Sequence, residues 1–395
     1  MKAFTFFSLV LSVATGIVSA QSLQSVKDMI IANAKADNID LTVLPCFDQA
    51  IADIQQIYAN APGQKRDFSR RQATTATAAN IVDVHAHVGP AWYKALFPTI
   101  GGQAVPDWKL NDTFNFMATQ GIQHSVLAFS VPGPNVWPGD QKKTIALARL
   151  MNEQAAAYGK VYPGVFNFYG QVPLPYTQDA ITEAKYATQK LGAVGIWLQS
   201  NTEGKYLGDL TFKPFFQAVN SWSGRQLLYI HPSIPLLRVN GQLIDSNPTP
   251  YVTGKIEFYF ETARTVMDLT LTQTIHNFTN INYLIPHVGG GFPAAIDRIL
   301  KSYPTIYDSS LQIYCTRFWW DSAGPTYFHQ VAGLLGYGIP KSQLLYGTDY
   351  PYAPLAVQPA SFTAVKNRPD FTADEKTAIF RGNAVKLFDG KIKFN

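Results

Sequence analysis

Short apolar segments alternate with longer amphipathic segments along most of the chain, from residue 81 onwards. Each apolar segment has few polar residues, and most are flanked by Gly, Pro or Asn, a pattern typical of buried strands. Eight strands are predicted, at 81–87, 125–130, 162–168, 193–198, 226–230, 281–285, 305–309 and 344–346. Helical patterns lie between them, at 113–120, 141–158, 177–190, 213–221, 256–277, 293–302 and 326–335.

A last helix is predicted to begin at Thr372, where Thr372 and Glu375 have the spacing of a capping box. Eight strands that alternate with helices predict an α/β fold, a (β/α)8 TIM barrel. An open doubly wound sheet is the alternative. No Gly-x-Gly-x-x-Gly follows a predicted strand, which weakens a dinucleotide-binding interpretation of that alternative.

The first 20 residues have the pattern of a secretory signal peptide. Lys2 precedes an apolar run over 4–18, and two small residues precede Gln21. The run is too short for a membrane anchor, and no later stretch has the length and hydrophobicity of a membrane span. We therefore expect the chain to enter the secretory pathway, to lack a membrane span, and to reach the vacuole or the outside of the cell.

Residues 21–71 form a separate N-terminal segment. Two modest helices are predicted in it, at 26–36 and 48–59, and two dibasic pairs follow, at 65–66 and 70–71. Paired basic residues suit a processing protease, so the segment is either a helical extension packed on the barrel or a removable pro-segment. A polar linker, 72–80, separates it from the barrel at 81–395.

Composition and charge narrow the possible partners. The formal net charge is +5, but Lys and Arg are spread along the chain, so we expect no nucleic-acid partner. The two cysteines, Cys46 and Cys315, permit at most one disulfide, which would tether the N-terminal segment to the barrel. In a secreted chain, the sequons at Asn111 and Asn277 are candidate glycosylation sites.

A pair of histidines ends the first predicted strand. Residues 81–90 read Ile-Val-Asp-Val-His-Ala-His-Val-Gly-Pro, so His85 and His87 lie two positions apart. Alternate residues of a strand point to the same side. Two imidazoles placed in this way can bind one metal ion, although a strand with two structural histidines is the plainer interpretation.

Further polar residues follow other predicted strands. His231 follows the fifth strand, His287 the sixth and Asp349 the eighth. The C-terminal ends of barrel strands meet around one site, so these side chains are expected to converge with those of the first strand. Each alone also suits a structural role. Together they offer a divalent ion three imidazoles and one carboxylate, with an open position and a further histidine beside it.

Several stretches, in this order, resemble the amidohydrolase superfamily: Asp-Val-His-Ala-His, Tyr-Ile-His-Pro, Pro-His-Val-Gly-Gly-Gly-Phe-Pro, Tyr-Gly-Thr-Asp-Tyr-Pro and Ile-Phe-Arg-Gly-Asn-Ala-Val-Lys-Leu-Phe. Within it they are similar to the branch of aminocarboxymuconate-semialdehyde, γ-resorcylate and 6-methylsalicylate decarboxylases. The resemblance covers about residues 81–388.

The resemblance implies roles for individual residues. His85, His87, His231 and Asp349 would hold one divalent metal ion, with zinc expected and manganese as the alternative. His287 and Asp349 would be the catalytic residues. The predicted fourth strand has no lysine to carry the carbamate that bridges two metals in the hydrolases of the superfamily. That absence favours one metal and the decarboxylase branch.

The expected activity is the metal-dependent, non-oxidative decarboxylation of a small phenolic acid such as 6-methylsalicylate. Aromatic residues in the predicted loops suit a flat ring, and Trp92 and Arg317 are the candidate substrate-binding residues. An ordinary surface salt bridge explains Arg317 equally well. A hydrolase of a lactone, ester or amide is the second interpretation, and a barrel without activity is the third. Dimers are common among proteins that resemble this chain, so a homodimer is an expectation from resemblance alone.

Overall fold

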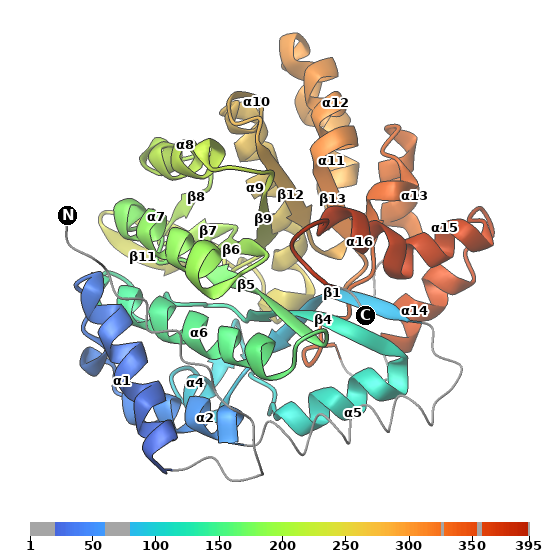
Figure 1. Ribbon diagram of the computed structural model, residues 1–395. Coiled ribbons are helices and arrows are strands. Elements are labelled where there is room, and N and C mark those ends of the chain that lie inside the picture. Colours follow the sequence, from blue (N-terminus) through green and yellow to red (C-terminus); the bar gives the residue numbers. More distant parts are fainter. Residues whose placement is uncertain (1–19, 60–79, 325–327, 354–357, 394–395) are drawn as a thin grey trace.

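Eight parallel strands form a single sheet that curls into a barrel (Figure 1). The computed structural model describes residues 20–59, 80–324, 328–353 and 358–393. The strands follow chain order around the barrel: β1 (Ile81–Val88), β4 (Ile122–Phe129), β5 (Phe166–Gln171), β6 (Gly195–Gln199), β9 (Gln226–His231), β12 (Ile281–Ile285), β13 (Phe318–Asp321) and β14 (Leu344–Leu345). Backbone hydrogen bonds from Val84 N to Tyr346 O (3.0 Å) and from His87 N to Tyr350 O (2.7 Å) join the segment that directly follows the last strand to the first strand. The predicted TIM barrel is confirmed.

Helices cover the outside of the barrel. The main ones are α5 (Leu110–Gln120), α6 (Gln141–Val161), α7 (Thr177–Tyr186), α8 (Lys213–Ser221), α9 (Glu257–Leu271), α11 (Phe292–Leu300), α12 (Tyr307–Arg317), α13 (Phe328–Gly336) and α14 (Gln358–Lys366). Shorter ones are α4 (Ala91–Lys94), α10 (Thr274–Asn277), α15 (Ala373–Thr377) and α16 (Asn383–Leu387). The capping box predicted at Thr372 is present, since Thr372 and Glu375 bond each other's backbone N–H groups.

Two of the predicted strands are misplaced. The third runs over 166–171 rather than 162–168, because α6 continues to Val161 and Tyr162 N still donates to Tyr158 O. The seventh is β13, whereas the predicted strand at 305–309 lies in a 3-10 turn and the start of α12. The Phe-Trp-Trp run at 318–320, which none of the predicted strands includes, is therefore a fully or nearly buried strand.

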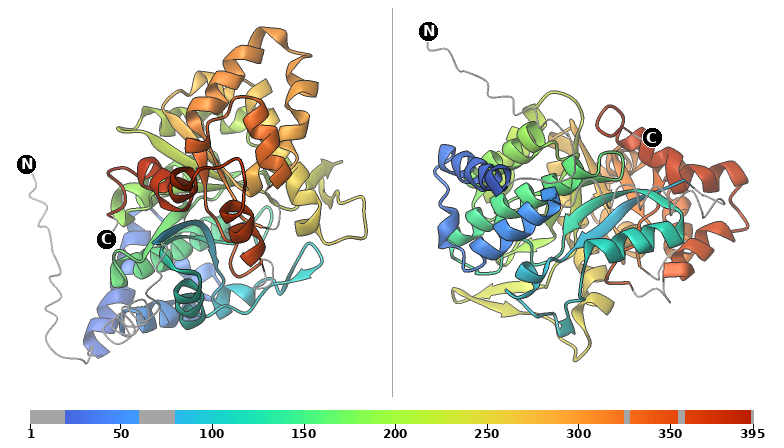
Figure 2. Two further views of the ribbon diagram at one scale, coloured as in Figure 1. Left: turned by 90° about the vertical axis from the view of Figure 1, so that its right-hand side faces the viewer. Right: turned by 60° about the horizontal axis from the view of Figure 1, so that its bottom comes forward.

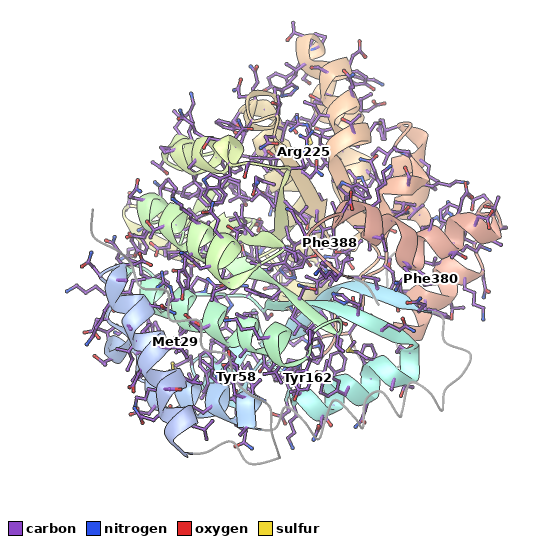
Figure 3. All side chains as sticks on the ribbon, in the orientation of Figure 1. Met29, Tyr58, Tyr162, Arg225, Phe380 and Phe388 are labelled. Atoms are coloured by element: carbon purple, nitrogen blue, oxygen red, sulfur yellow. The ribbon has the colours of Figure 1, made fainter. Side chains whose placement is uncertain are left out.

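The two helices predicted in the N-terminal segment are present and pack against α6. They are α1 (Ala20–Ala36) and α2 (Phe47–Ala59), and Figure 3 labels Met29 and Tyr58 on them. Ile51 and Ile54 on the inner face of α2 are almost completely buried. The signal-peptide region and the dibasic pairs lie outside the described residues. Cys46 and Cys315 are both free thiols, so the disulfide considered from the sequence is not formed.

The barrel interior is filled by side chains, and one end of it is closed by the C-terminal helix. Phe388, labelled in Figure 3, is fully buried and packs near Tyr169 of β5. The hairpins β2–β3 (Thr99–Ile100, Gln103–Ala104) and β10–β11 (Leu236–Val239, Gln242–Asp245) extend from the other end (Figure 2). A third hairpin, β7–β8, spans Asn201–Thr202 and Lys205–Tyr206. Among the described helices, none is both long and apolar enough to cross a membrane.

Candidate metal centre

Four side chains from three parts of the barrel converge at the C-terminal ends of the strands. His85 and His87 come from β1, His231 is the last residue of β9, and Asp349 follows β14. One potential ligand atom from each lies within 4.8 Å of all the others. Asp349 Oδ1 is 3.4 Å from His85 Nε2 and 3.2 Å from His87 Nε2. The predicted convergence of these four residues is therefore present.

The imidazoles are oriented so that their Nε2 atoms face one another. His85 Nδ1 lies 3.0 Å from Asp321 Oδ2, and His231 Nδ1 lies 2.7 Å from Pro232 O. These contacts place the ring proton on Nδ1 and leave the Nε2 lone pair toward the cluster. His231 Nε2 is buried and has no hydrogen-bond partner in the described structure. A divalent cation would satisfy these nitrogen lone pairs and the Asp349 carboxylate together.

Burial and neighbouring charges shift the pKa values of the side chains in this cluster. Burial lowers the pKa of His87, and it lowers the pKa of His231 well below the ordinary value. Burial acts on His85 in the same way, but the carboxylates of Asp321 and Asp349 outweigh it and raise the pKa of His85 to about 10. Burial would raise the pKa of Asp349, yet the neighbouring imidazoles of His287, His85 and His87 hold it well below the ordinary range. The two carboxylates thus create a site that favours positive charge.

His287 lies beside the cluster rather than in it. Its Nε2 is 3.7 Å from Asp349 Oδ2, whereas His85 and His87 face Asp349 Oδ1. His287 and Asp349 both have left-handed backbone conformations, with φ of 54° and 60°. Such conformations are uncommon outside glycine and are found at functional sites. Asp349 N donates to His85 O at 2.8 Å, which fixes this loop against β1.

Asp321 at the end of β13 was missed from the sequence. It is fully buried, and its Oδ1 accepts backbone hydrogen bonds from His287 N (3.2 Å) and Ala323 N (2.9 Å). One carboxylate therefore holds both a metal-facing imidazole and the turn that carries His287. A strand assignment at 318–321 would have placed Asp321 at the same end of the barrel as the ligands.

Replacing Asp321 by Asn is expected to weaken metal binding by about 10- to 100-fold, because partners of metal-bound histidines contribute to affinity on this scale. Competition with a chelating indicator measures that affinity. Asp308→Asn, at an exposed position of α12, is the control and should leave it unchanged. Equal affinities for the two variants would show that Asp321 does not support His85.

Gly347 is required by the close approach of three strands. A Cβ built at this position would lie 2.7 Å from His85 Cβ and 3.2 Å from the Asp321 carboxyl group. We expect Gly347→Ala to displace His85 and to lower metal affinity about tenfold or more. Gly336→Ala, where a Cβ would meet nothing within 4 Å, is the matched control. Elemental analysis after dialysis compares the two, and full metal retention in Gly347→Ala would contradict the expectation.

Aromatic rings surround the converging imidazoles. Trp197 of β6 stacks on His231 with 5.7 Å between ring centroids, and the Tyr352 ring meets His87 edge-on at 5.3 Å. Tyr259 of α9 lies 5.5 Å from the His287 ring. Tyr352 lies in the loop after β14, where aromatic residues were expected, whereas Trp197 and Tyr259 lie on a strand and a helix. They form flat apolar walls beside the site.

The two predicted substrate-binding residues lie at opposite ends of the barrel strands. Trp92 of α4 is buried, and its Nε1 donates to Gln154 Oε1 at 2.8 Å. Arg317 precedes β13, at the opposite end of the barrel from the ligands, and donates to the carbonyl oxygens of Ile275, Phe278 and Ile281. The substrate-binding role predicted for Arg317 is therefore wrong. Its guanidinium holds α10 and the start of β12 together. Arg317 is therefore neither a substrate clamp nor part of a surface salt bridge.

Comparison with known proteins identifies one family, and two of the similar proteins are named as decarboxylases. The amidohydrolase family profile matches residues 82–390. The decarboxylase yanB of Aspergillus niger is 28% identical over 78% of this chain and 87% of its own length. The 6-methylsalicylic acid decarboxylase of Penicillium expansum is 27% identical over 78% of this chain and 95% of its own length.

Solved structures share the fold. A structure described as an amidohydrolase II is 26% identical, with a TM-score of 0.71 over 78% of this chain and 99% of that one. A 5-carboxyvanillate decarboxylase of Novosphingobium aromaticivorans, solved with manganese, is 20% identical, with a TM-score of 0.63 over 78% of this chain and 95% of that one. Because the carboxyvanillate decarboxylase is only 20% identical to this chain, its similarity supports the barrel fold alone.

Proposed function

Because the chain belongs to the amidohydrolase family, we propose that it is a metal-dependent, non-oxidative decarboxylase of a small phenolic acid of the salicylate type, such as 6-methylsalicylate. The observation that carries the proposal is the convergence of His85, His87, His231 and Asp349 on one point. Strand β6, the fourth of the barrel, has no lysine, which favours one metal. Relatives named as decarboxylases favour carboxy-lyase chemistry over hydrolysis.

The four converging residues would hold one divalent ion. Three imidazoles and one carboxylate suit zinc, and manganese is the alternative. Such an ion would bind the carboxylate and phenolate oxygens of an ortho-hydroxy acid and withdraw charge from them. Elemental analysis of protein purified without added metal distinguishes the two.

The chain's own residues then orient the ring and supply the proton. The walls formed by Trp197, Tyr259 and Tyr352 would hold a flat ring and exclude water. Loss of CO2 requires a proton on the ring carbon that carried the carboxylate. Asp349 is the group we assign to deliver it, after its carboxylate has first taken up a proton from His287. His287 Nε2, 3.7 Å from Asp349 Oδ2, is placed to return a proton to that oxygen.

The test is incubation of purified protein with 6-methylsalicylate and related hydroxybenzoates while released CO2 is measured. We expect CO2 and the corresponding phenol from at least one of them, and loss of the activity when a chelator removes the metal. Restoring a divalent ion should restore the rate. An absence of CO2 from every acid, together with hydrolysis of a lactone or ester panel, would replace this proposal by a hydrolase.

We also propose that the protein follows the secretory pathway to the vacuole or the cell exterior. The support is the sequence pattern of residues 1–20, together with the exposure of Asn111 and Asn277. An epitope-tagged chain should shift in mobility when N-glycans are removed, and a cytosolic signal on imaging would overturn the location. A homodimer is the expected assembly, and light scattering after size-exclusion chromatography measures it.

A further inference from the structure

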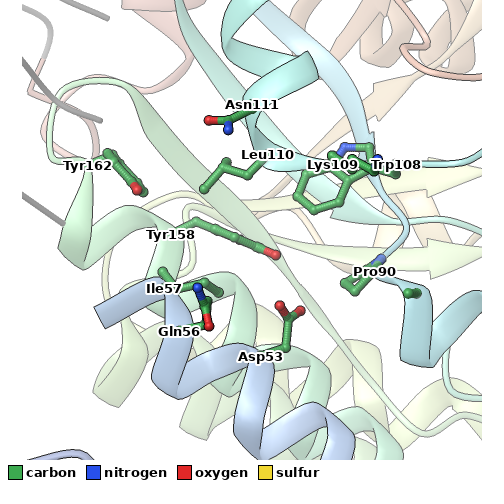
Figure 4. Close-up of a pocket in the computed structure, with 11 residues that line it drawn as sticks. Asp53, Gln56, Ile57, Pro90, Trp108, Lys109, Leu110, Asn111, Tyr158 and Tyr162 are labelled. Carbon is green, nitrogen blue, oxygen red and sulfur yellow. The ribbon is translucent and has the colours of Figure 1, made fainter. Parts of the chain in front are cut away.

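A cavity lies outside the barrel, where α2 of the N-terminal segment packs against it (Figure 4). Its volume is about 410 Å³, and its walls come from α2, α6, the turn after β1 and the start of α5. The lining includes none of the metal-centre residues His85, His87, His231 and Asp349, nor His287 or Asp321. Three lining residues, Asp53, Gln56 and Ile57, precede residue 82, where the family match begins. The cavity is therefore built partly from a segment that the family match does not include.

Asp53 gives this cavity a negative charge. Its Oδ2 accepts a hydrogen bond of 2.7 Å from the neutral amide of Gln154, and none of the described cations forms an ion pair with it. Burial raises the pKa of Asp53, with the Gln154 bond acting in the opposite direction. A partly buried carboxylate that has only a neutral partner is stabilised by a cation.

Three of the eleven lining residues are aromatic: Trp108, Tyr158 and Tyr162. In Figure 4 the Asp53 carboxylate and the Tyr158 hydroxyl point to the same part of the cavity, and the Trp108 ring lies across from them. Aromatic faces next to a carboxylate attract organic cations. Lys109 also lines the cavity, but its side chain is exposed and its charge acts on Asp107, whose pKa is lowered by Lys94 first and by Lys109 as well.

We propose that this cavity binds a small organic ammonium ion, with the nitrogen against Asp53 and the hydrocarbon part against the Trp108 and Tyr158 rings, which pack edge-to-face with 5.7 Å between their centroids. The site is linked to the loop that follows the metal-binding strand. Gln154 Nε2 donates to Asp53 and, at 2.8 Å, to Tyr158 Oη, while Gln154 Oε1 accepts from Trp92 Nε1. A ligand bound to Asp53 therefore contacts a carboxylate whose hydrogen-bond partner, the side-chain amide of Gln154, also holds Trp92.

The probe is 2-phenylethylammonium, titrated into the full-length protein by calorimetry at pH 7 without any carboxylic acid present. We expect saturable binding, at least about tenfold tighter than that of neutral 2-phenylethanol, because a charge-assisted hydrogen bond is lost in the alcohol. Asp53→Asn should weaken binding of the cation about tenfold while keeping the side-chain shape. Asp48→Asn, on the same helix but outside the cavity, is the matched control and should bind as the wild type does.

Equal affinities of the wild type and Asp53→Asn would overturn the proposal, as would equal binding of the alcohol or an absence of binding by the wild type. If Asp53→Asn does not fold, Ala91→Met serves instead, because Ala91 is exposed and lines the cavity. The larger side chain should also weaken binding. The readout needs no decarboxylation, so its outcome is separate from that of the proposed activity.

Discussion

Replacing Asp349 by Asn is expected to lower kcat for decarboxylation by about 1000-fold, since a positioned acid and a metal ligand are lost together. Asn has almost the same shape as Asp and is one of the few residues that tolerate the left-handed conformation, with φ of 60°, found here. The fold should therefore survive. The rate of CO2 release at saturating substrate measures the effect.

The two roles of Asp349 are separated by measuring metal content alongside the rate. Excess divalent metal should restore occupancy in Asp349→Asn but not the rate. His287→Gln is the matched comparison, because His287 contacts Asp349 without belonging to the metal-binding group, so its metal content should stay at the wild-type level. A fully metallated Asp349→Asn protein with more than a tenth of the wild-type kcat would show that another group delivers the proton.

Most of the barrel was predictable because its strands are short apolar runs bounded by turn-forming residues. Strand β13 was missed for a physical reason. It has four residues, three of them aromatic, and it follows α12 with no Gly or Pro between them. The stretch at 305–309 has the β-branched residues Thr305 and Ile306 and so matched a strand better in isolation, although tertiary packing makes it helical.

The misplacement of strand β13 also determined which residues of the metal centre could be predicted from the sequence. His85, His87, His231 and Asp349 each follow an apolar run that was identified as a strand, so their convergence followed from barrel geometry. Asp321 ends the misplaced strand, and its role was hidden with it. Trp197 and Tyr259 could not be predicted as site residues, because the sequence does not distinguish an aromatic residue beside a metal centre from one in the hydrophobic core.

Removing the charge of Arg149 is expected to lower the free energy of unfolding by ~3–5 kcal/mol, the usual cost of leaving a buried ionic partner uncompensated. Arg149 is fully buried on α6. Its guanidinium donates to Glu183 of α7 at 2.9 Å and to Asp37, just after α1, at 2.7 Å. It also donates to Asn33 O at 3.1 Å. One side chain thus joins the N-terminal helices to the barrel.

Arg149→Met tests this, with urea unfolding followed by circular dichroism. Lys27→Met is the matched control, because Lys27 pairs with Asp48 at 3.3 Å on the surface of the same N-terminal segment, and such pairs contribute ~0–1 kcal/mol. Adding Glu183→Gln to Arg149→Met should recover part of the loss, since the uncompensated carboxylate is then gone. A loss in Arg149→Met no larger than that in Lys27→Met would mean that the N-terminal helices do not depend on this ionic contact. A large loss would support a segment that stays with the barrel as part of the folded protein, rather than one that is shed.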